Sequence, residues 1–242
     1  MENRNYISKY NKSEIEQIIK ATEYAIWELV QFFNKEKDFF FTEKELHSFF
    51  YHKCISSGNF PTVEGFNLVH AEYPTPFKLK RNEDTGDIEN AGVKDKFVRG
   101  HIDLVVLNPN FVDFVKTQKD RNTLLSGVST TKLYTQYIIE LKECYSRFNK
   151  ETNEPILLYA IEFKYVRYKF VGTNLPIKEI KSDIKKLQLI KSFVLDGESV
   201  DFCRNTKAIA FFGYMVEKNK SIFEKELSGS GAELYFYNKG DF

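Results

Sequence analysis

The stretches Gly100-His101-Ile102-Asp103-Leu104-Val105-Val106 and Ile161-Glu162-Phe163-Lys164-Tyr165 decide how this chain is interpreted. Both are rich in the β-branched and aromatic residues that favour strands, and both carry charged groups among apolar ones. Successive side chains of a strand point to opposite faces, so Glu162 and Lys164 share one face. An acid within an apolar strand is costly unless it is paired or binds a metal. The sequence therefore predicts two strands, and it predicts that their charged residues Asp103, Glu162 and Lys164 belong to a functional site.

These three residues favour metal-assisted chemistry on a phosphate. Asp103 and Glu162 supply carboxylate oxygens, which hard divalent cations such as Mg²⁺ take as ligands. Lys164 adds an ammonium that can stabilise an attacked phosphate or position the attacking water. In the alternative interpretation, Asp103 is a solvated acid at a strand edge and Glu162 pairs with Lys164 on a solvated face. The uncharged run at 157–161 argues against this, because it indicates a central strand.

Composition sets broad limits. The chain has 242 residues, of which 42% are hydrophobic and 29% charged, as in a soluble globular protein. The net charge of +1 gives no overall basic signature, although a local patch can still bind nucleic acid. Cys54, Cys144 and Cys203 are widely spaced, which disfavours a zinc site or a disulfide framework. The polar N-terminus and the lack of a long apolar run predict a cytoplasmic protein without membrane segments.

The spacing of apolar residues predicts an alternation of helices and strands. Helical periodicity predicts helices at 13–34, 43–56 and 176–194, and a helical segment within 111–155. Apolar runs predict strands at 66–73, 100–107, 157–166, 207–216 and 233–237. Ser13 with Glu16 is a candidate capping box. Pro74 and Pro76 are expected to end the strand at 66–73.

This element order and the D…E-x-K residues Asp103, Glu162 and Lys164 resemble the PD-(D/E)XK, or restriction-endonuclease-like, nuclease superfamily. The resemblance implies an α/β fold whose core order is helix-strand-strand-strand-helix-strand, with a mixed central sheet flanked by helices. It covers about 43–216. One departure is Ile102, where the superfamily usually has proline before the aspartate.

The rest of the chain is interpreted relative to this core, as parts of one domain spanning 1–242. The helix at 13–34 is an extra N-terminal helix, and 217–242 is a C-terminal extension. Asp103 and Glu162 lie farther apart than the superfamily commonly places these acids. The excess implies an insertion, which we place at 111–155.

The resemblance also implies roles for individual residues. Asp103, Glu162 and the backbone carbonyl of Phe163 would hold one or two Mg²⁺ or Mn²⁺ ions, and Lys164 would serve the water or the phosphate. The superfamily often has a further glutamate on the helix before the first strand, a place that Glu45 fits. A capping box formed with Thr42 explains Glu45 equally well, so both interpretations stay open.

Two more residues are weaker site candidates. His101 shares a face with Asp103 and is placed to contact phosphate, although a structural role is the commoner one for a lone histidine. Glu72 ends the first predicted strand, where a solvated charge is the simpler interpretation. His47 and His52 are five residues apart, which is poor spacing for one helix face, and they lack the carboxylate pattern of zinc proteases.

Basic residues outnumber acidic ones between 160 and 191, in a chain that is almost neutral overall. The resemblance places the helix of this segment beside the active site. Such a set can contact the phosphate backbone of a nucleic acid, whereas any single lysine is more simply a solvated helix residue. The candidate nucleic-acid contacts are Lys181, Lys185, Arg167, Lys169 and Gln188.

We therefore expect a metal-dependent nuclease that hydrolyses phosphodiester bonds, with DNA rather than RNA as substrate by analogy with the superfamily. Cleavage of both strands by one site per chain would favour a homodimer. Alternatives are a catalytically silent nucleic-acid-binding module on the same fold, a nucleotide hydrolase and a protein-interaction module. The chain lacks a G-x-x-x-x-G-K loop, which excludes the P-loop class.

Overall fold

The computed structural model describes residues 6–36, 40, 42–63, 65–81, 88–90, 98–118, 124–125, 127–128, 138–166, 174–195, 197–213 and 217–237. The helices of this part are α1 (Lys12–Lys35), α2 (Glu43–Ser56), α3 (Pro109–Lys116), α6 (Ile138–Thr152), α7 (Asn174–Lys191) and α8 (Glu217–Glu226). The strands are β1 (Val69–Arg81), β2 (Ile88–Asn90), β3 (Val98–Leu107), β4 (Leu157–Val166), β5 (Val194–Leu195), β6 (Glu198–Ser199), β7 (Cys203–Phe212) and β8 (Ala232–Phe236).

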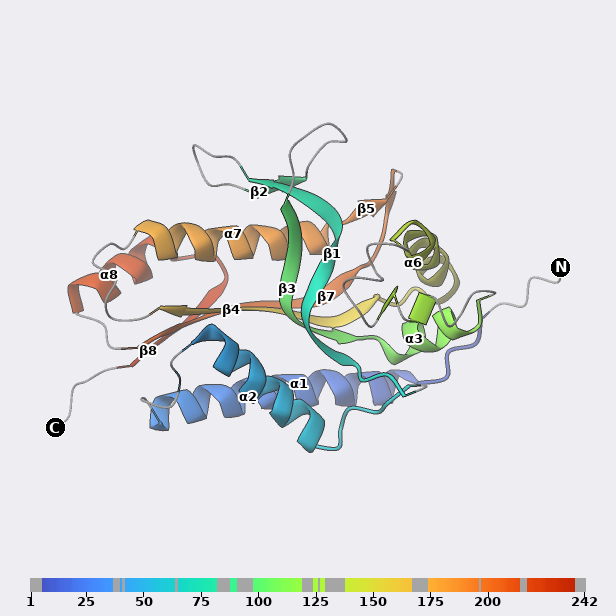
Figure 1. The fold of residues 1–242 in the computed structure, drawn as a ribbon, viewed down its shortest axis with the longest axis horizontal. Coiled ribbons are helices and arrows are strands. Elements are labelled where there is room, and N and C mark those ends of the chain that lie inside the picture. Colours follow the sequence, from blue (N-terminus) through green and yellow to red (C-terminus); the bar gives the residue numbers. More distant parts are fainter. Residues whose placement is uncertain are drawn as a thin grey trace.

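The described strands build a mixed sheet between layers of helices. Its order is β2-β1-β3-β4-β7-β8, antiparallel from β2 to β4 and parallel from β4 to β8. Helix α7 lies on one face of β4 and β7, while α1 and α2 lie on the other (Figure 1). The predicted α/β class, with a mixed sheet flanked by helices, is confirmed. None of the described helices has both the length and the apolar character needed to cross a membrane.

Helices α1 and α2 form where the periodicity predicts them. Helix α2 has the predicted bounds, and α1 begins one residue before and ends one residue after the predicted 13–34. The predicted capping box of α1 was wrong, because Asn11 rather than Ser13 caps the helix and Glu14 rather than Glu16 completes the box. Asparagine at this position accepts from two backbone N–H groups that the first turn leaves free.

Strand β1 corrects another prediction, since it does not stop at Pro74. It continues through Pro74 and Pro76 to Arg81. Its pairing with β3 is irregular between Pro74 and Lys78, and β2 pairs with it only from Leu79 onward. A proline lacks an N–H, so it is tolerated where the ladder is interrupted or where a strand has no neighbour. The prolines therefore lie in the part of β1 where its pairing with β3 is irregular.

The predicted insertion and extension both carry regular structure. Helices α3 and α6 lie within 111–155 or overlap it, and they pack through the aromatic rings of Phe111, Phe114, Tyr145 and Phe148. Most of residues 119–137 fall outside the described part of the chain. In the C-terminal extension, β8 pairs with β7 and so widens the central sheet.

The sheet divides at the two motif strands. Strands β3 and β4 pair only from Leu104 opposite Ile161 to Leu107 opposite Leu157. Beyond that point β3 stays paired with β1, while β4 stays paired with β7 as far as Val166. In Figure 1, β1 and β3 consequently run across the direction of β4 and β7. We call the opening between β3 and β4 the fork.

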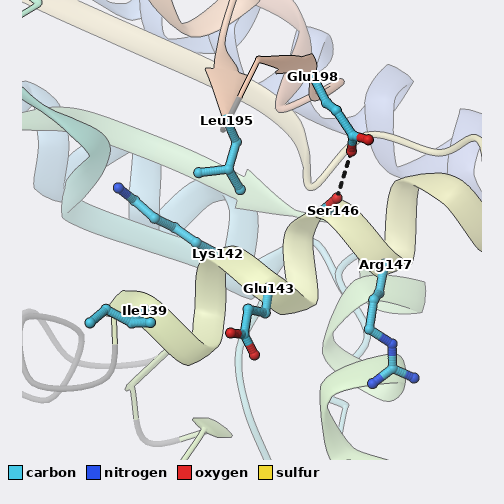
Figure 2. A pocket seen from close by; sticks show the side chains of 7 residues that line it. All are labelled: Ile139, Lys142, Glu143, Ser146, Arg147, Leu195 and Glu198. Atoms are coloured by element: carbon cyan, nitrogen blue, oxygen red, sulfur yellow. Dashed lines mark hydrogen bonds between the residues drawn. The ribbon is translucent and has the colours of Figure 1, made fainter.

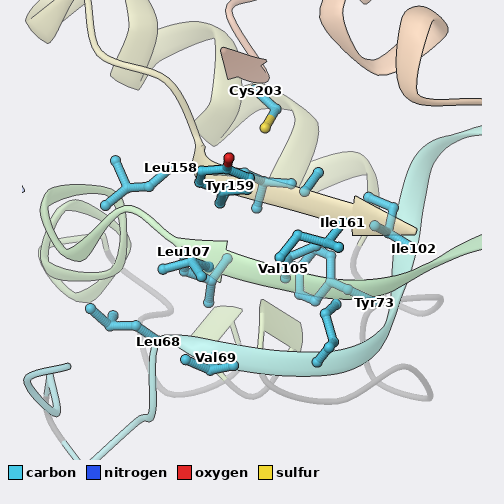
Figure 3. Close-up of a cluster of buried hydrophobic side chains, with 14 of the residues drawn as sticks. Leu68, Val69, Tyr73, Ile102, Val105, Leu107, Leu158, Tyr159, Ile161 and Cys203 are labelled. Carbon is cyan, nitrogen blue, oxygen red and sulfur yellow. The ribbon is translucent and has the colours of Figure 1, made fainter. Parts of the chain in front are cut away.

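The paired part of these strands is apolar on both sides. Figure 3 shows side chains of β1, β3 and β4, among them Val69, Val105 and Ile161, packed into one buried cluster. Asp103 and Glu162 follow directly on Leu104 and Ile161, at the mouth of the fork. The change from apolar to charged residues therefore coincides with the end of the β3–β4 pairing.

Glu72 offers a test of backbone strain in this region. Its φ is 53°, although it lies between two regular pairs, Ala71 with Leu104 and Tyr73 with Ile102. A side chain at positive φ costs about 1 kcal/mol, which glycine avoids. We expect Glu72→Gly to exceed Glu72→Ala by about 1 kcal/mol in free energy of unfolding, measured with urea. Both variants lack the carboxylate, so equal stabilities would contradict the strain.

Candidate active site

Asp103 occupies the mouth of the fork and bridges it. Its Oδ2 accepts a hydrogen bond of 2.7 Å from the backbone N–H of Phe163 on β4. This N–H faces β3 beyond the last β3–β4 pair, so the carboxylate takes the place of a missing ladder acceptor. The predicted closeness of Asp103 to the E-x-K segment is therefore present in the structure.

The carbonyl of Phe163 points to the same side of β4. In an extended strand the N–H and the C=O of one residue face the same neighbouring strand. Since the N–H of Phe163 reaches Asp103, its carbonyl also faces the fork. The role of this carbonyl as a metal ligand stays a prediction.

Glu162 is the most deeply buried acid of the site, with 2% of its surface exposed. Its Oε2 lies 2.7 Å from Lys186 Nζ, and its buried Oε1 has no hydrogen-bond partner among the described residues. Burial raises the pKa of Glu162 well above its ordinary value, and nearby Asp103 raises it further while Lys186 lowers it. The free oxygen is what a cation ligand requires.

Lys186 is a site residue that sequence reasoning missed. Its ammonium donates to the backbone carbonyl of His101 at 2.7 Å and lies 3.6 Å from Asp183. Burial lowers the pKa of Lys186, but the charges of Glu162 and Asp183 outweigh this and hold it above the usual value. Lys186 therefore stays charged. His101, for its part, brings its backbone to the site, while its side chain is half-buried.

The sequence contained a signal for Asp183, the second acid beside Lys186. Asp183 follows Ile180 by three residues and precedes Leu187 by four, so it lies on the apolar face of α7. A charged residue on that face is expected to have a partner in the sheet. The charge count over 160–191 hid the signal, because it treated Asp183 and Lys186 as surface charges.

Lys164 lies between two helices. Its ammonium is 2.9 Å from Glu179 of α7 and 3.5 Å from Glu43 of α2. Burial lowers the pKa of Lys164, but the hydrogen bond that its ammonium donates to Glu179 and the charge of Glu43 raise the pKa above the usual value overall. The lysine is thus charged and fixed in position. The simple pairing with Glu162 across one strand face is not what the structure contains.

Helix α2 contributes Glu43 and His47, which the sequence analysis left without a role. One ligand atom from each of them and one from Asp103 lie within 4.8 Å of one another. Glu43 Oε2 also accepts from the N–H of Tyr165, at 3.2 Å. The spacing of four residues, which places both side chains on one helix face, was the available signal.

Glu45 has the geometry of a cap. Its Oε2 accepts from the N–H of Thr42 at 2.7 Å and from the Thr42 hydroxyl at 3.2 Å. The structure therefore brings Glu43, rather than Glu45, beside Lys164 and His47.

The remaining candidates are exposed or lie outside the described residues. Glu72 is exposed on β1, at the level of Asp103 on β3, and Lys185 and Gln188 are exposed on α7. Lys181 is exposed as well and pairs with Glu226 at 3.3 Å. Arg167 and Lys169 are outside the described residues. Since Lys164, Lys181 and Lys186 are each paired with carboxylates, the local positive charge is weaker than the sequence suggests.

A surface hollow of about 690 Å³ lies elsewhere, between α6 and the β5–β6 hairpin (Figure 2). Ser146 and Glu198 meet across it at 3.4 Å. Its lining residues are Ile139, Lys142, Glu143, Ser146, Arg147, Leu195 and Glu198. None of the predicted site residues is among them.

Comparison of the chain with protein-family models, with curated proteins and with solved structures finds no significant match. The resemblance carried by the D…E-x-K residues therefore has no support from a relative. A function has to be argued from the geometry of the fork.

The buried pair of Glu162 and Lys186 is expected to be strongly coupled. Removing one partner of a buried ion pair costs about 3–5 kcal/mol because the other charge is left unpaired. We expect Lys186→Met to destabilise the protein by about 3 kcal/mol, and by at least about 1 kcal/mol less when Glu162→Gln is already present. Urea unfolding of both single variants and the double variant measures this, with exposed Lys185→Met as the control. Additive effects would contradict the coupling.

Asp183 gives a pH-dependent test. Burial raises the pKa of Asp183 to about 6, an effect that Lys186 opposes. An unfolded aspartate ionises at a lower pH. As the pH rises from about 4 to about 6, the unfolded state therefore loses its proton first, and the free energy of unfolding falls. Relative to Asp183→Asn, the wild type should lose up to about 3 kcal/mol of unfolding free energy over this window. Urea titrations in EDTA at pH 4 and pH 7.5 measure the difference, and a pH-independent difference would refute the assignment.

Proposed function

We propose that this chain is a metal-dependent nuclease that hydrolyses phosphodiester bonds in DNA, on a restriction-endonuclease-like core. The observation that carries the proposal is that Asp103 accepts from the N–H of Phe163, between Glu162 and Lys164 in the chain, where β3 and β4 separate. The element order α2, β1, β3, β4, α7 and β7 supports the proposed core topology. In this arrangement β2 is a short addition that pairs only with the end of β1.

The charges around the fork favour a cation. The carboxylates are those of Glu43, Asp103, Glu162, Glu179 and Asp183, and the ammonium groups are those of Lys164 and Lys186. An anionic phosphate would be repelled by this excess of acids. A divalent cation would neutralise the acids and allow the phosphate to approach, which is a reason for acids in a phosphate site.

Mg²⁺ or Mn²⁺ fits the residues present. Asp103, the free Oε1 of Glu162 and the carbonyl of Phe163 would hold it. The bound ion would supply a water of lowered pKa and neutralise charge on the scissile phosphate. Lys164, fixed by Glu179 and Glu43, would hold that water or the phosphate oxygen in place. Lys186 would oppose the effect of burial on the pKa of Glu162 and so favour the ionised form that acts as a ligand.

Substrate contacts outside the fork are proposed for α7. Lys185 and Gln188 are exposed on this helix, and Lys181 is exposed beside Glu226. Such groups give affinity for the phosphate backbone without reading sequence. A homodimer would place two such sites on the two strands of a duplex.

The second candidate is a nucleic-acid-binding module on the same fold that does not cleave. The observation in its favour is that Glu162 is already engaged by Lys186. A buried acid with an internal counter-ion does not need a metal to be stable in the fold. The two candidates differ in turnover, which an assay measures directly.

The test is cleavage of supercoiled plasmid and of labelled single-stranded DNA in Mg²⁺, Mn²⁺ or EDTA. We expect metal-dependent cutting by the wild type, reduced by at least about 100-fold in Asp103→Ala and in Lys164→Ala, because each removes a group that acts on the reacting phosphate. Lys44→Ala, an exposed lysine of α2, is the matched control and should cut normally.

Each outcome decides between the candidates. Cutting that is lost in both site variants and retained in Lys44→Ala supports the nuclease. Salt-sensitive DNA binding by a wild type that does not cut supports the binding module. A wild type that neither binds nor cuts DNA would contradict both candidates for this substrate.

A further inference from the structure

We propose that Glu43 and His47 of α2, together with Asp103, form a second cation position that contains a nitrogen ligand and prefers a transition-metal dication to Mg²⁺. This position shares Asp103 with the proposed nuclease site. The proposal rests on the proposed function only in taking Asp103 as a ligand of that site too. The other ligands come from the helix on the opposite side of Asp103 from Glu162. The two positions would therefore form a pair of cation sites bridged by one carboxylate.

The separation of His47 and Asp103 is the first argument. His47 Nε2 lies 3.7 Å from Asp103 Oδ2, which is too long for a hydrogen bond. Two ligands on one metal, each about 2.1 Å from it, lie between about 3 Å and about 4.2 Å apart, depending on the angle at the metal. The observed gap falls within that interval. The third ligand atom, from Glu43, lies within 4.8 Å of both.

The burial of His47 is an independent second argument. Only 8% of this residue is exposed, and its Nε2 is buried without a hydrogen-bond partner among the described residues. A polar atom left unpaired in the interior costs free energy, so its presence needs a reason. The atom faces the Asp103 carboxylate, and the ring of Phe163 lies against the imidazole with centroids 5.8 Å apart. The imidazole is therefore held in a ligand's orientation.

Both acids of the proposed position are fixed by the backbone of β4. The N–H of Phe163 donates to Asp103, and the N–H of Tyr165 donates to Glu43. These N–H groups lie beyond the last pairing of β4 with β3. Hydrogen bonds of this kind orient metal ligands and strengthen binding. The fork thus provides both the opening for a cation and the backbone N–H groups that fix its two carboxylate ligands.

The ligand types define the preferred metal. Imidazole nitrogen suits transition-metal dications such as Fe²⁺ and Zn²⁺, and Mn²⁺, although lowest in the transition-metal order, accepts it more readily than Mg²⁺, which takes oxygen ligands. The position beside Glu162 offers only oxygen atoms, so the two positions would differ in preference. We expect Mn²⁺ to bind the His47 position at least about 10-fold more tightly than Mg²⁺ does.

The test is titration of the full chain with Mn²⁺ in the absence of nucleic acid, with free Mn²⁺ followed by electron paramagnetic resonance. We expect a tight Mn²⁺ whose pulsed spectrum contains a ¹⁴N coupling. His47→Gln should remove the coupling and weaken this Mn²⁺ at least about 10-fold. His52→Gln is the control, because His52 is exposed on the same helix and should behave as the wild type does. Glu43→Gln, a near-isosteric change, should weaken the same ion.

The results separate this proposal from the nuclease. Tight Mn²⁺ with a ¹⁴N coupling that only His47→Gln removes supports the cation position, even if the chain cuts no DNA. Unchanged affinity in folded His47→Gln and Glu43→Gln, or bound Mn²⁺ without ¹⁴N coupling, overturns it. Metal-dependent cutting by a chain without that coupling would leave the nuclease intact and overturn this proposal alone. Failure to bind Mn²⁺ at all also overturns it.

Discussion

The separation of β3 from β4 is the constraint on which the polar centre of this molecule depends. The strands pair as far as Leu104 and Ile161 and then follow different neighbours. If the two strands stayed paired, the backbone N–H and C=O groups of β4 would form hydrogen bonds with β3. The fork instead leaves the N–H groups of Phe163 and Tyr165 to carboxylates from another strand and a helix. The separation of β3 from β4 thus frees backbone N–H groups of β4 and also fixes the positions of the acids that accept from them.

Holding acids in that opening is expensive, and the pKa directions record the cost. Burial raises the pKa values of Glu162 and Asp183, which means that their ionised forms are disfavoured in the folded chain. Lys186 offsets part of this through its contact with both. An apolar cluster would have stabilised the fold with less penalty, as the neighbouring core of β3 and β4 shows. Under the proposed function this cost has an explanation, because the acids would hold the cation.

The sequence predicted those parts of the structure that depend on local pattern. The bounds of α2 and β4 follow from periodicity and strand alternation, whereas the meeting of Asp103 with the E-x-K segment was implied by the resemblance. It failed where the answer depends on tertiary neighbours. Pro74 does not end β1, because it pairs with His101 at the point where the β1–β3 ladder becomes irregular, and the strand continues beyond it. The choice between Glu43 and Glu45 depends on how α2 is rotated against the sheet, which local pattern does not fix.

Under the proposed function, the fork couples metal binding to substrate binding. The carboxylates that surround Lys164 and Lys186 disfavour an approaching phosphate until cations neutralise them. Because linkage is reciprocal, a phosphate that binds more tightly with metal present must also tighten the metal by the same factor. Asp103, which lies between the Glu162 side and the His47 side, would then transmit charge between both cation positions and the phosphate. Its single carboxylate is consequently the group through which all three ligands influence one another.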